Sequence, residues 1–85
     1  MIKELEKKIT QKIENEKMLV ICRETEGSPN LQRVVPNRIN IEHGIYIEGD
    51  DYILDISDKV TYDVSFDELE DEFMVRQGHD IYTFS

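Results

Sequence analysis

The chain has 85 residues, 39% of them apolar and 34% charged, and a formal net charge of −9. This length excludes a second domain, while the apolar content supports one modest core, so we expect a single folded α+β domain over residues 1–85. The negative charge disfavours direct binding to nucleic-acid phosphate or to an anionic membrane surface. Residues 1–40 hold eight basic and six acidic side chains, whereas residues 41–85 hold two and thirteen, so the acidity belongs to the second half.

The first ten residues, MIKELEKKIT, alternate charged and apolar side chains and therefore differ from a secretory signal. No stretch reaches the ~20 consecutive apolar residues that a membrane-spanning helix needs. The one cysteine, Cys22, cannot form an intrachain disulfide, which agrees with a reducing compartment. We expect a cytoplasmic protein, located in the host cytoplasm if a phage encodes it.

Apolar residues near the N-terminus recur at the spacing of one helix stripe and predict a helix over about residues 2–16. The members of this stripe are Ile2, Leu5, Ile9 and Ile13. The apolar run MLVIC, residues 18–22, predicts a strand that is buried on both faces. The polar segment that follows, residues 24–30, is typical of a loop.

Isoleucines at odd positions from Ile39 to Ile47 predict one long strand over residues 38–48, in which Gly44 is a candidate bulge. A second alternating segment, residues 59–64, predicts a shorter strand. The segment IYTF at the C-terminal end predicts a last strand. These strands favour one antiparallel sheet of four or five strands.

A two-residue turn at Gly49 and Asp50 would fold the long strand back on the next segment as a hairpin. In that register Glu48 faces Asp51 and Ile47 faces Tyr52, so apolar residues oppose apolar residues away from the turn. The acidic pair beside the turn would then lie at a solvent-exposed tip.

The acidic stretch DVSFDELEDEF, residues 63–73, predicts a second helix before the last strand. Ser65 and Glu68 have the spacing of a capping box, and Val64 with Leu69 has that of a hydrophobic staple. Three apolar residues at helical spacing would form the buried stripe, while the acids cover the rest of the circumference. The stripe consists of Phe66, Leu69 and Phe73.

These acids exceed what the predicted helix needs for its own stability. Asp67 and Glu68 complement the helix dipole, but the later acids gain little from it. On a helix, five acids in six residues give one charge per roughly 1.8 Å, against about 1.7 Å for duplex DNA. Both a solvated face and a partner-binding face fit this pattern. Met74 and Val75 would lie beside the acids as apolar anchors, or the helix would unwind near Met74 and one of the two would be buried.

The candidate partner-binding surface contains acids from the predicted second helix, the two apolar residues that follow them and the acids of the predicted hairpin. Its members are Asp63, Asp67, Glu68, Glu70, Asp71, Glu72, Met74, Val75, Glu48, Asp50 and Asp51.

No pattern in the sequence names a reaction. Cys22, His43 and His79 include the residue types of a thiol nucleophile with its base, but Cys22 lies in an apolar run where an inert thiol is expected. The acids and histidines lack the ligand spacing of calcium or zinc sites, and no phosphate-binding loop is present. We therefore expect no enzymatic activity, no cofactor and no metal; a small hydrolase that uses Cys22 or a carboxylate pair is the enzymatic alternative.

In size, charge and element order, the chain resembles the small acidic anti-defence proteins of phages and mobile elements, which include anti-CRISPR proteins and uracil-DNA glycosylase inhibitors. The residues that carry this resemblance are the acids between Asp63 and Glu72 and those around Asp50, without a family motif. It implies a non-enzymatic inhibitor that occupies the basic nucleic-acid-binding surface of a protein such as a nuclease. The alternative is a structural or regulatory subunit of a homodimer or hetero-oligomer, in which the acids serve solubility.

Overall fold

The computed structural model describes residues 2–85, which form one α-helix and eight β-strands. The α+β class and the N-terminal helix are therefore confirmed, whereas the second helix is absent from the described chain. The elements are α1 (Ile2–Glu16), β1 (Leu19–Thr25), β2 (Ser28–Val34), β3 (Arg38–Asn40), β4 (Gly44–Gly49), β5 (Tyr52–Ser57), β6 (Asp63–Asp67), β7 (Glu72–Gln77) and β8 (Asp80–Phe84).

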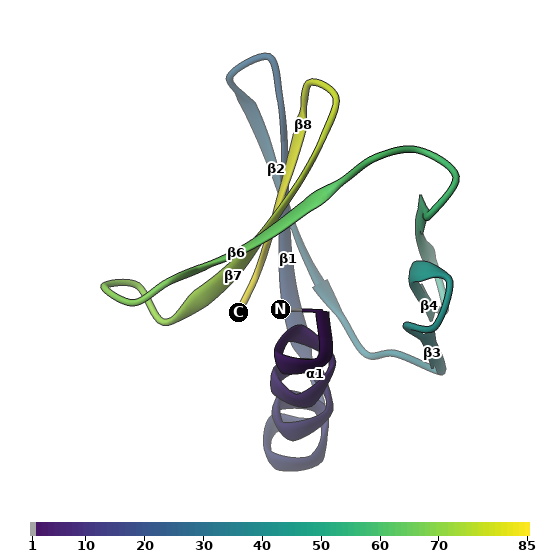
Figure 1. Cartoon of the computed structure of the whole chain (residues 1–85). Coiled ribbons are helices and arrows are strands. Elements are labelled where there is room, and N and C mark those ends of the chain that lie inside the picture. The colour runs from purple at the N-terminus through teal and green to yellow at the C-terminus, as the bar shows by residue number, and fades with distance from the viewer. Residues whose placement is uncertain (1) are drawn as a thin grey trace.

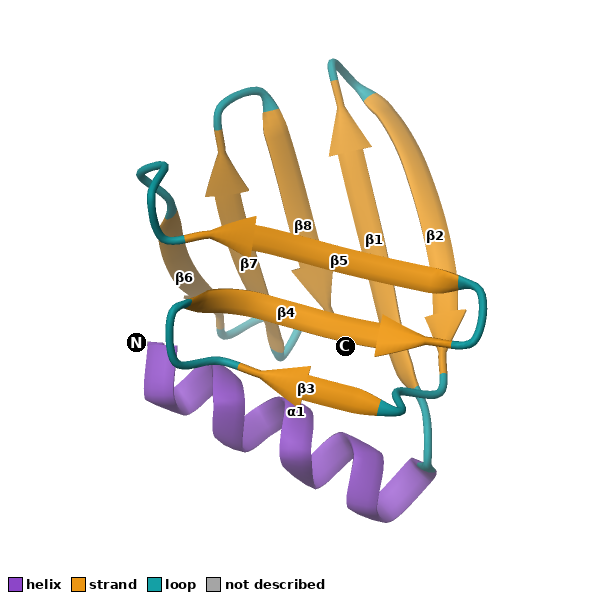
Figure 2. Ribbon diagram, turned by 90° about the vertical axis from the view of Figure 1, so that its right-hand side faces the viewer, coloured by secondary structure: helices purple, strands orange, loops and turns teal. Residues whose placement is uncertain are grey.

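The strands form two antiparallel sheets, and not the single sheet predicted. Five strands lie in the order β2-β1-β8-β7-β6, and the other three lie in the order β3-β4-β5. The sheets face each other, and the strands of the smaller sheet cross those of the larger one steeply (Figure 2). Helix α1 lies along one open end, below both sheets in the same view, so it closes the space between them (Figures 1 and 2).

The core fills the space between the two inner sheet faces and the helix. Alternate residues of β1, β4, β5, β7 and β8 point into it, as expected for strands with one buried face. Helix α1 contributes Leu5 and Ile9, which have no exposed surface, and Ile2 and Ile13 pack against the core. The other buried residues are Leu19, Ile21, Val34, Ile45, Ile47, Leu54, Ile56, Phe73, Val75, Tyr82 and Phe84.

The predicted first strand exists but is buried on one face only, because Cys22 on the opposite face is half-buried. It also continues through the segment predicted as a loop, since β1 and β2 form a hairpin around Glu26 and Gly27. Both turn residues have positive φ, 52° and 82°, which matches the twist that a two-residue hairpin requires. The polar composition of residues 24–30 therefore reflects an exposed hairpin at the edge of the sheet, and not a loop.

The predicted long strand over residues 38–48 is wrong, because β3 and β4 are two strands that pair with each other. The side chain of Asn40 accepts a hydrogen bond from the backbone N–H of Glu42 at 3.1 Å, which starts the reversal. Gly44 follows with φ of 101°, a conformation that suits glycine. Ile39 and Ile47 thereby lie opposite each other on the same face.

The hairpin of β4 and β5 is present, but its turn consists of Asp50 and Asp51, one position later than predicted, so each β4 residue pairs two positions further along β5 than predicted. Gly49 belongs to the strand and pairs with Tyr52. A Cβ atom on Gly49 would lie 3.0 Å from Cγ1 of Val34, so glycine allows β2 to approach this strand closely. Packing between the sheets therefore explains a glycine that the sequence suggested was a turn residue.

The predicted second helix is a hairpin of β6 and β7, joined by residues 68–71. Val64 pairs with Val75, and the rings of Phe66 and Phe73 lie 4.8 Å apart across the two strands. The predicted capping box and hydrophobic staple do not form. Strand β7 also pairs with β8 from Phe73 to Gln77, so strand pairing outweighs the local helix signals.

Candidate functional site

The tip of the β6–β7 hairpin, residues 67–72, gathers most of the predicted acids. Oδ1 of Asp67 accepts hydrogen bonds from the backbone N–H groups of Leu69 and Glu70, at 3.0 and 3.3 Å. Asp71 completes the reversal with φ of 53°, a conformation that aspartate tolerates better than most residues. The tip lies at the far left of Figure 1.

Leu69 lies at the outermost part of this turn, and 96% of its surface is exposed. Its chain neighbours Glu68 and Glu70 are also exposed, and neither side chain has a hydrogen bond or an ion pair among residues 2–85. The sequence assigned Leu69 to the buried stripe of a helix. The structure instead places an apolar side chain between two acids in solvent.

The acids of the hairpin are partly balanced by cations that come from elsewhere in the chain. Nζ of Lys8 on α1 lies 2.9 Å from Oδ2 of Asp71, and Asp63 lies opposite Arg76 in the strand register. Sequence reasoning missed the first pair because 63 positions separate its members. The ion pair links the hairpin to the helix and leaves the net negative charge on the other acids.

Met74 and Val75 were both predicted to lie outside, beside the acids. Because successive residues of a strand point to opposite faces, only one of them can do so. Val75 has no exposed surface and belongs to the core, whereas Met74 is half-buried on the outer face of the sheet. The prediction that Val75 is an accessible anchor is therefore wrong, and Met74 remains at the surface.

Glu48, Asp50 and Asp51 belong to the three-stranded sheet, far from the acidic tip, since β4 and the tip lie on opposite sides of Figure 1. Two of these acids have intramolecular partners. Oε2 of Glu48 accepts a hydrogen bond from the Tyr46 hydroxyl at 2.6 Å, which raises the pKa of that tyrosine. Oδ1 of Asp50 accepts one from Nδ2 of Asn37 at 2.8 Å. The two groups of predicted acids cannot form one continuous surface.

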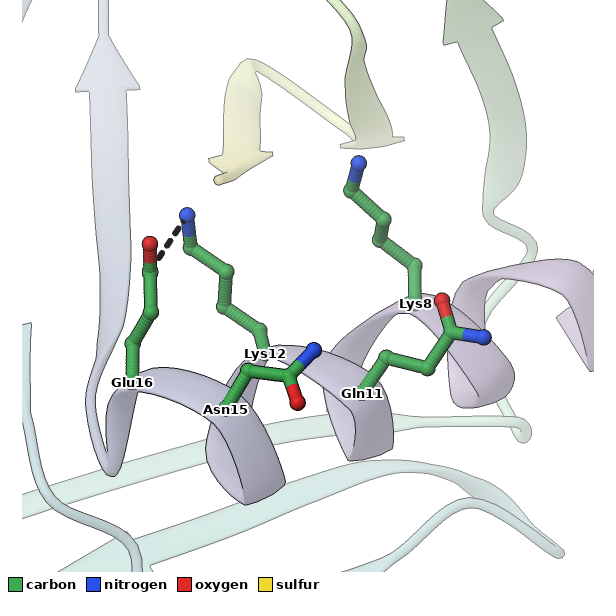
Figure 3. Close-up of a pocket in the computed structure, with 5 residues that line it drawn as sticks. All are labelled: Lys8, Gln11, Lys12, Asn15 and Glu16. Atoms are coloured by element: carbon green, nitrogen blue, oxygen red, sulfur yellow. Dashed lines mark ion pairs between the residues drawn. The ribbon is translucent and has the colours of Figure 1, made fainter.

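A shallow hollow of about 150 Å³ lies on α1. Its lining residues are Lys8, Gln11, Lys12, Asn15 and Glu16. Figure 3 shows the side chains of Lys8 and Lys12 pointing in the same direction, with the 2.6 Å ion pair between Lys12 and Glu16 at one end. All the lining residues come from one helix, so the hollow is the space between side chains of successive turns, and we assign no ligand to it.

The residues considered for catalysis do not form a site. Cys22 is half-buried on β1, His43 lies between β3 and β4, and His79 lies in the turn between β7 and β8. Nδ1 of His43 is 3.7 Å from Oδ2 of Asp58, and no hydrogen bond joins Cys22 to either histidine among the described residues. Within residues 2–85, no group of three or more histidine, cysteine, aspartate or glutamate residues could hold a metal ion.

A cluster of polar side chains lies on the inner face of the five-stranded sheet, where the last residues of β1 meet the first residue of β8. Oδ1 of Asp80 accepts a hydrogen bond from the Thr25 hydroxyl at 2.6 Å, and Oδ2 lies 2.9 Å from Nη2 of Arg23. The Arg23 guanidinium is also 5.6 Å from the centre of the Tyr82 ring. The hydrogen bond from Thr25, followed by the bond and charge of Arg23, lowers the pKa of Asp80 below its ordinary value of 3.8.

The lowered pKa predicts how the stability contribution of Asp80 depends on pH. The folded state favours the carboxylate, so this contribution is present above the ordinary pKa and is lost as pH falls through the lower, folded-state value. Asp80→Asn should lower the melting temperature at neutral pH, and its difference from the wild type should shrink below pH 3.8. Thermal melts followed by circular dichroism over this range test the effect; a difference that stays constant would contradict it.

No helix in residues 2–85 combines the length and the apolar character needed to cross a bilayer. The chain matches no protein-family model, and no curated protein or solved structure shows detectable similarity to it. Function must therefore be inferred from the residues and their arrangement.

Proposed function

We propose that this protein is a non-enzymatic acidic binding protein that inhibits a cytoplasmic nuclease or defence protein by occupying its basic nucleic-acid-binding surface. The contact would be made by the tip of the β6–β7 hairpin. The observation that carries the proposal is the position of Leu69, 96% exposed between Glu68 and Glu70 in an ordered turn.

An exposed leucine gains nothing from burial in the isolated chain, yet full burial of such a side chain in an interface is worth about 1.5–3 kcal/mol. The neighbouring acids select a partner of opposite charge and speed association by electrostatic steering. A basic groove with an apolar recess matches both features. Because the Asp67 side chain already orders the turn, binding would lose less conformational entropy than it would with a mobile loop.

The acids of residues 67–72 do not have the charge spacing of DNA that a helix would give them, because they lie on a hairpin of strands. A strand rises ~3.4 Å per residue, so charges along one strand are more widely spaced than those along duplex DNA. The hairpin brings acids of both its strands together next to the turn, with Asp67 directly opposite Glu72. The negative charge is therefore concentrated at a folded tip, and a partner would contact a projecting acidic loop.

Charge reversal at the tip tests this proposal. We expect the immobilised protein to capture a basic nucleic-acid-binding protein from an extract of its native host, in a manner that salt and added duplex DNA reduce. The double variant Glu68→Lys with Glu70→Lys should lower the affinity for that protein at least tenfold, because both side chains lie beside Leu69 and have no structural partner. Binding of the purified partner by calorimetry gives the affinities.

A matched control is available on the other side of the molecule. Asp51→Lys with Asp55→Lys changes the net charge by the same amount, and both side chains are exposed on the three-stranded sheet without a hydrogen bond among the described residues. This control should retain binding. Equal losses in both double variants would show that net charge alone matters, and unchanged binding in the tip variant would refute the proposed contact.

The alternative function, a subunit of an oligomer, is favoured by one separate observation. The outer face of the five-stranded sheet, opposite the core, carries uncharged side chains such as Leu31, which is 54% exposed. This face could bind another protein without the acidic tip.

A further inference from the structure

The five-stranded sheet has a second face, which points away from the smaller sheet and away from the viewer in Figure 2. None of its side chains is buried, although the opposite face carries much of the core. The strand register fixes which of these residues lie side by side. This face, called the outer face below, therefore has a defined pattern of charge.

The middle row of the outer face runs across all five strands and contains no charged residue. From β2 to β6 its members are Leu31, Cys22, Thr83, Met74 and Ser65. Three of them are half-buried by their neighbours, whereas Leu31 and Ser65 are exposed. A row of this kind offers contact area without the cost of desolvating charge.

Charged residues of both signs flank this uncharged row on both sides. One flanking row begins with Arg33 on β2 and ends with Glu72 and Asp67 on β7 and β6. The other flanking row, from β2 to β6, consists of Pro29, Glu24, Ile81, Arg76 and Asp63. Each row carries one cation, and the two cations lie on opposite sides of the central strand β8.

We propose that the outer face binds a second copy of this chain, with a twofold axis that runs along β8. This rotation places β2 over β6 of the other copy, and β1 over its β7. Arg33 then faces the partner's Asp67, and Glu24 faces the partner's Arg76. Because the interface is isologous, each pair occurs twice.

The same rotation also matches the uncharged residues. Cys22 meets the partner's Met74, while Thr83 and Ile81 lie on the axis and meet their own counterparts. The remaining acids, Glu72 and Asp63, face the partner's Val20 and the partner's Pro29, so no like charges are opposed. A twofold axis across the strands would instead oppose Asp67 to the partner's Asp63, which favours the axis along β8.

The size of the face predicts a reversible dimer. Five strands ~4.8 Å apart and five residues at ~3.4 Å each give a flat area of roughly 400 Å² per copy, or about 800 Å² in total, which is below the size of a standard specific interface and fits a weak, transient dimer. Two sheets of the same twist can pack face to face at about 10 Å with nearly aligned strands. Asp67 and Glu72 of the tip belong to this face, whereas Glu68, Leu69 and Glu70, which would contact the inhibited protein, lie in the turn beyond it, so dimerisation and the proposed inhibition rest on different residues.

Charge exchange across the interface gives the first test. In sedimentation equilibrium the wild type should dimerise as its concentration rises, and Glu24→Arg or Arg76→Glu alone should raise the dissociation constant at least tenfold. The variant with both changes should recover dimerisation, because the pair is re-formed with its signs exchanged. A wild type that stays monomeric up to about 1 mM would overturn the proposal, as would a double variant weaker than either single one.

Chemical crosslinking gives a test that does not depend on altered charges. With Cys22→Ala as background, Thr83→Cys places a thiol beside the axis, whereas Asp55→Cys places one on the outer face of the three-stranded sheet. A short bis-maleimide should join two copies of the Thr83→Cys protein and leave the Asp55→Cys protein largely monomeric, after circular dichroism has shown that both are folded. The opposite result, or equal crosslinking of both, would refute this interface.

Discussion

Gly44→Ala should remove most of the folding stability of this domain. Gly44 has φ of 101°, and a Cβ atom added there would lie 2.1 Å from the carbonyl oxygen of Ile56 and 3.0 Å from the backbone nitrogen of Asp58. The strained φ costs of order 1–3 kcal/mol, and relief of the contact requires β5 to move within its sheet. We expect a total loss above about 3 kcal/mol, a large fraction of the stability of a small domain.

Urea unfolding followed by circular dichroism measures this loss, and Gly78→Ala provides the control. Gly78 also has positive φ, 60°, but nothing lies within 4 Å of an added Cβ atom. Its replacement should therefore cost only the conformational strain, about 1 kcal/mol. Similar losses at the two positions would mean that the β3–β4 turn does not approach β5 as described.

Val75→Asp should unfold the protein, whereas Met74→Asp should leave it folded. Val75 is fully buried and pairs with Val64 and Tyr82 on the two neighbouring strands. A carboxylate at this position would lose its hydration without gaining a partner, which costs several kcal/mol. Met74 points to the outer face, where solvent can reach a carboxylate.

This pair of variants also distinguishes the hairpin from the helix that the sequence predicts. On that helix both residues would lie outside the buried stripe, so both substitutions would be tolerated. On a strand, successive side chains point to opposite faces, so Met74→Asp is tolerated and Val75→Asp is not. Thermal melts and amide NMR spectra decide between them, and a folded Val75→Asp protein with an unchanged melting temperature would contradict the pairing of β7 in the sheet.

The local parts of the fold could be predicted because their signals are local. The stripe from Ile2 to Ile13 has helical spacing over about three turns, and α1 has the predicted bounds. The segment that predicted a last strand is β8, and a hairpin does link the residues on either side of Asp50. These elements can be predicted because the spacing of apolar residues within each short segment indicates its secondary structure.

The candidate site could be predicted only in part. Composition located the acids of residues 63–72 correctly, and the hairpin brings them together. The same reasoning assigned Leu69 to the core, although it is the most exposed large apolar residue described. A turn at residues 68–71 between two alternating segments would predict an exposed leucine at a tip. The capping-box spacing of Ser65 and Glu68 favours a helix instead.

By itself, the sequence determined the acidic balance, the α+β class, the N-terminal helix and which residues carry charge. Only the tertiary structure decided that residues 63–77 are strands, that Val75 is buried and that Lys8 pairs with Asp71. The physical reason is that the decisive contacts come from segments distant in the chain: β8, the neighbour of β7, pairs with β1, and Lys8 comes from α1, so no local window contains their contribution. Only the folded chain shows that the acidic stretch of residues 63–73 forms a hairpin with an exposed leucine at its tip.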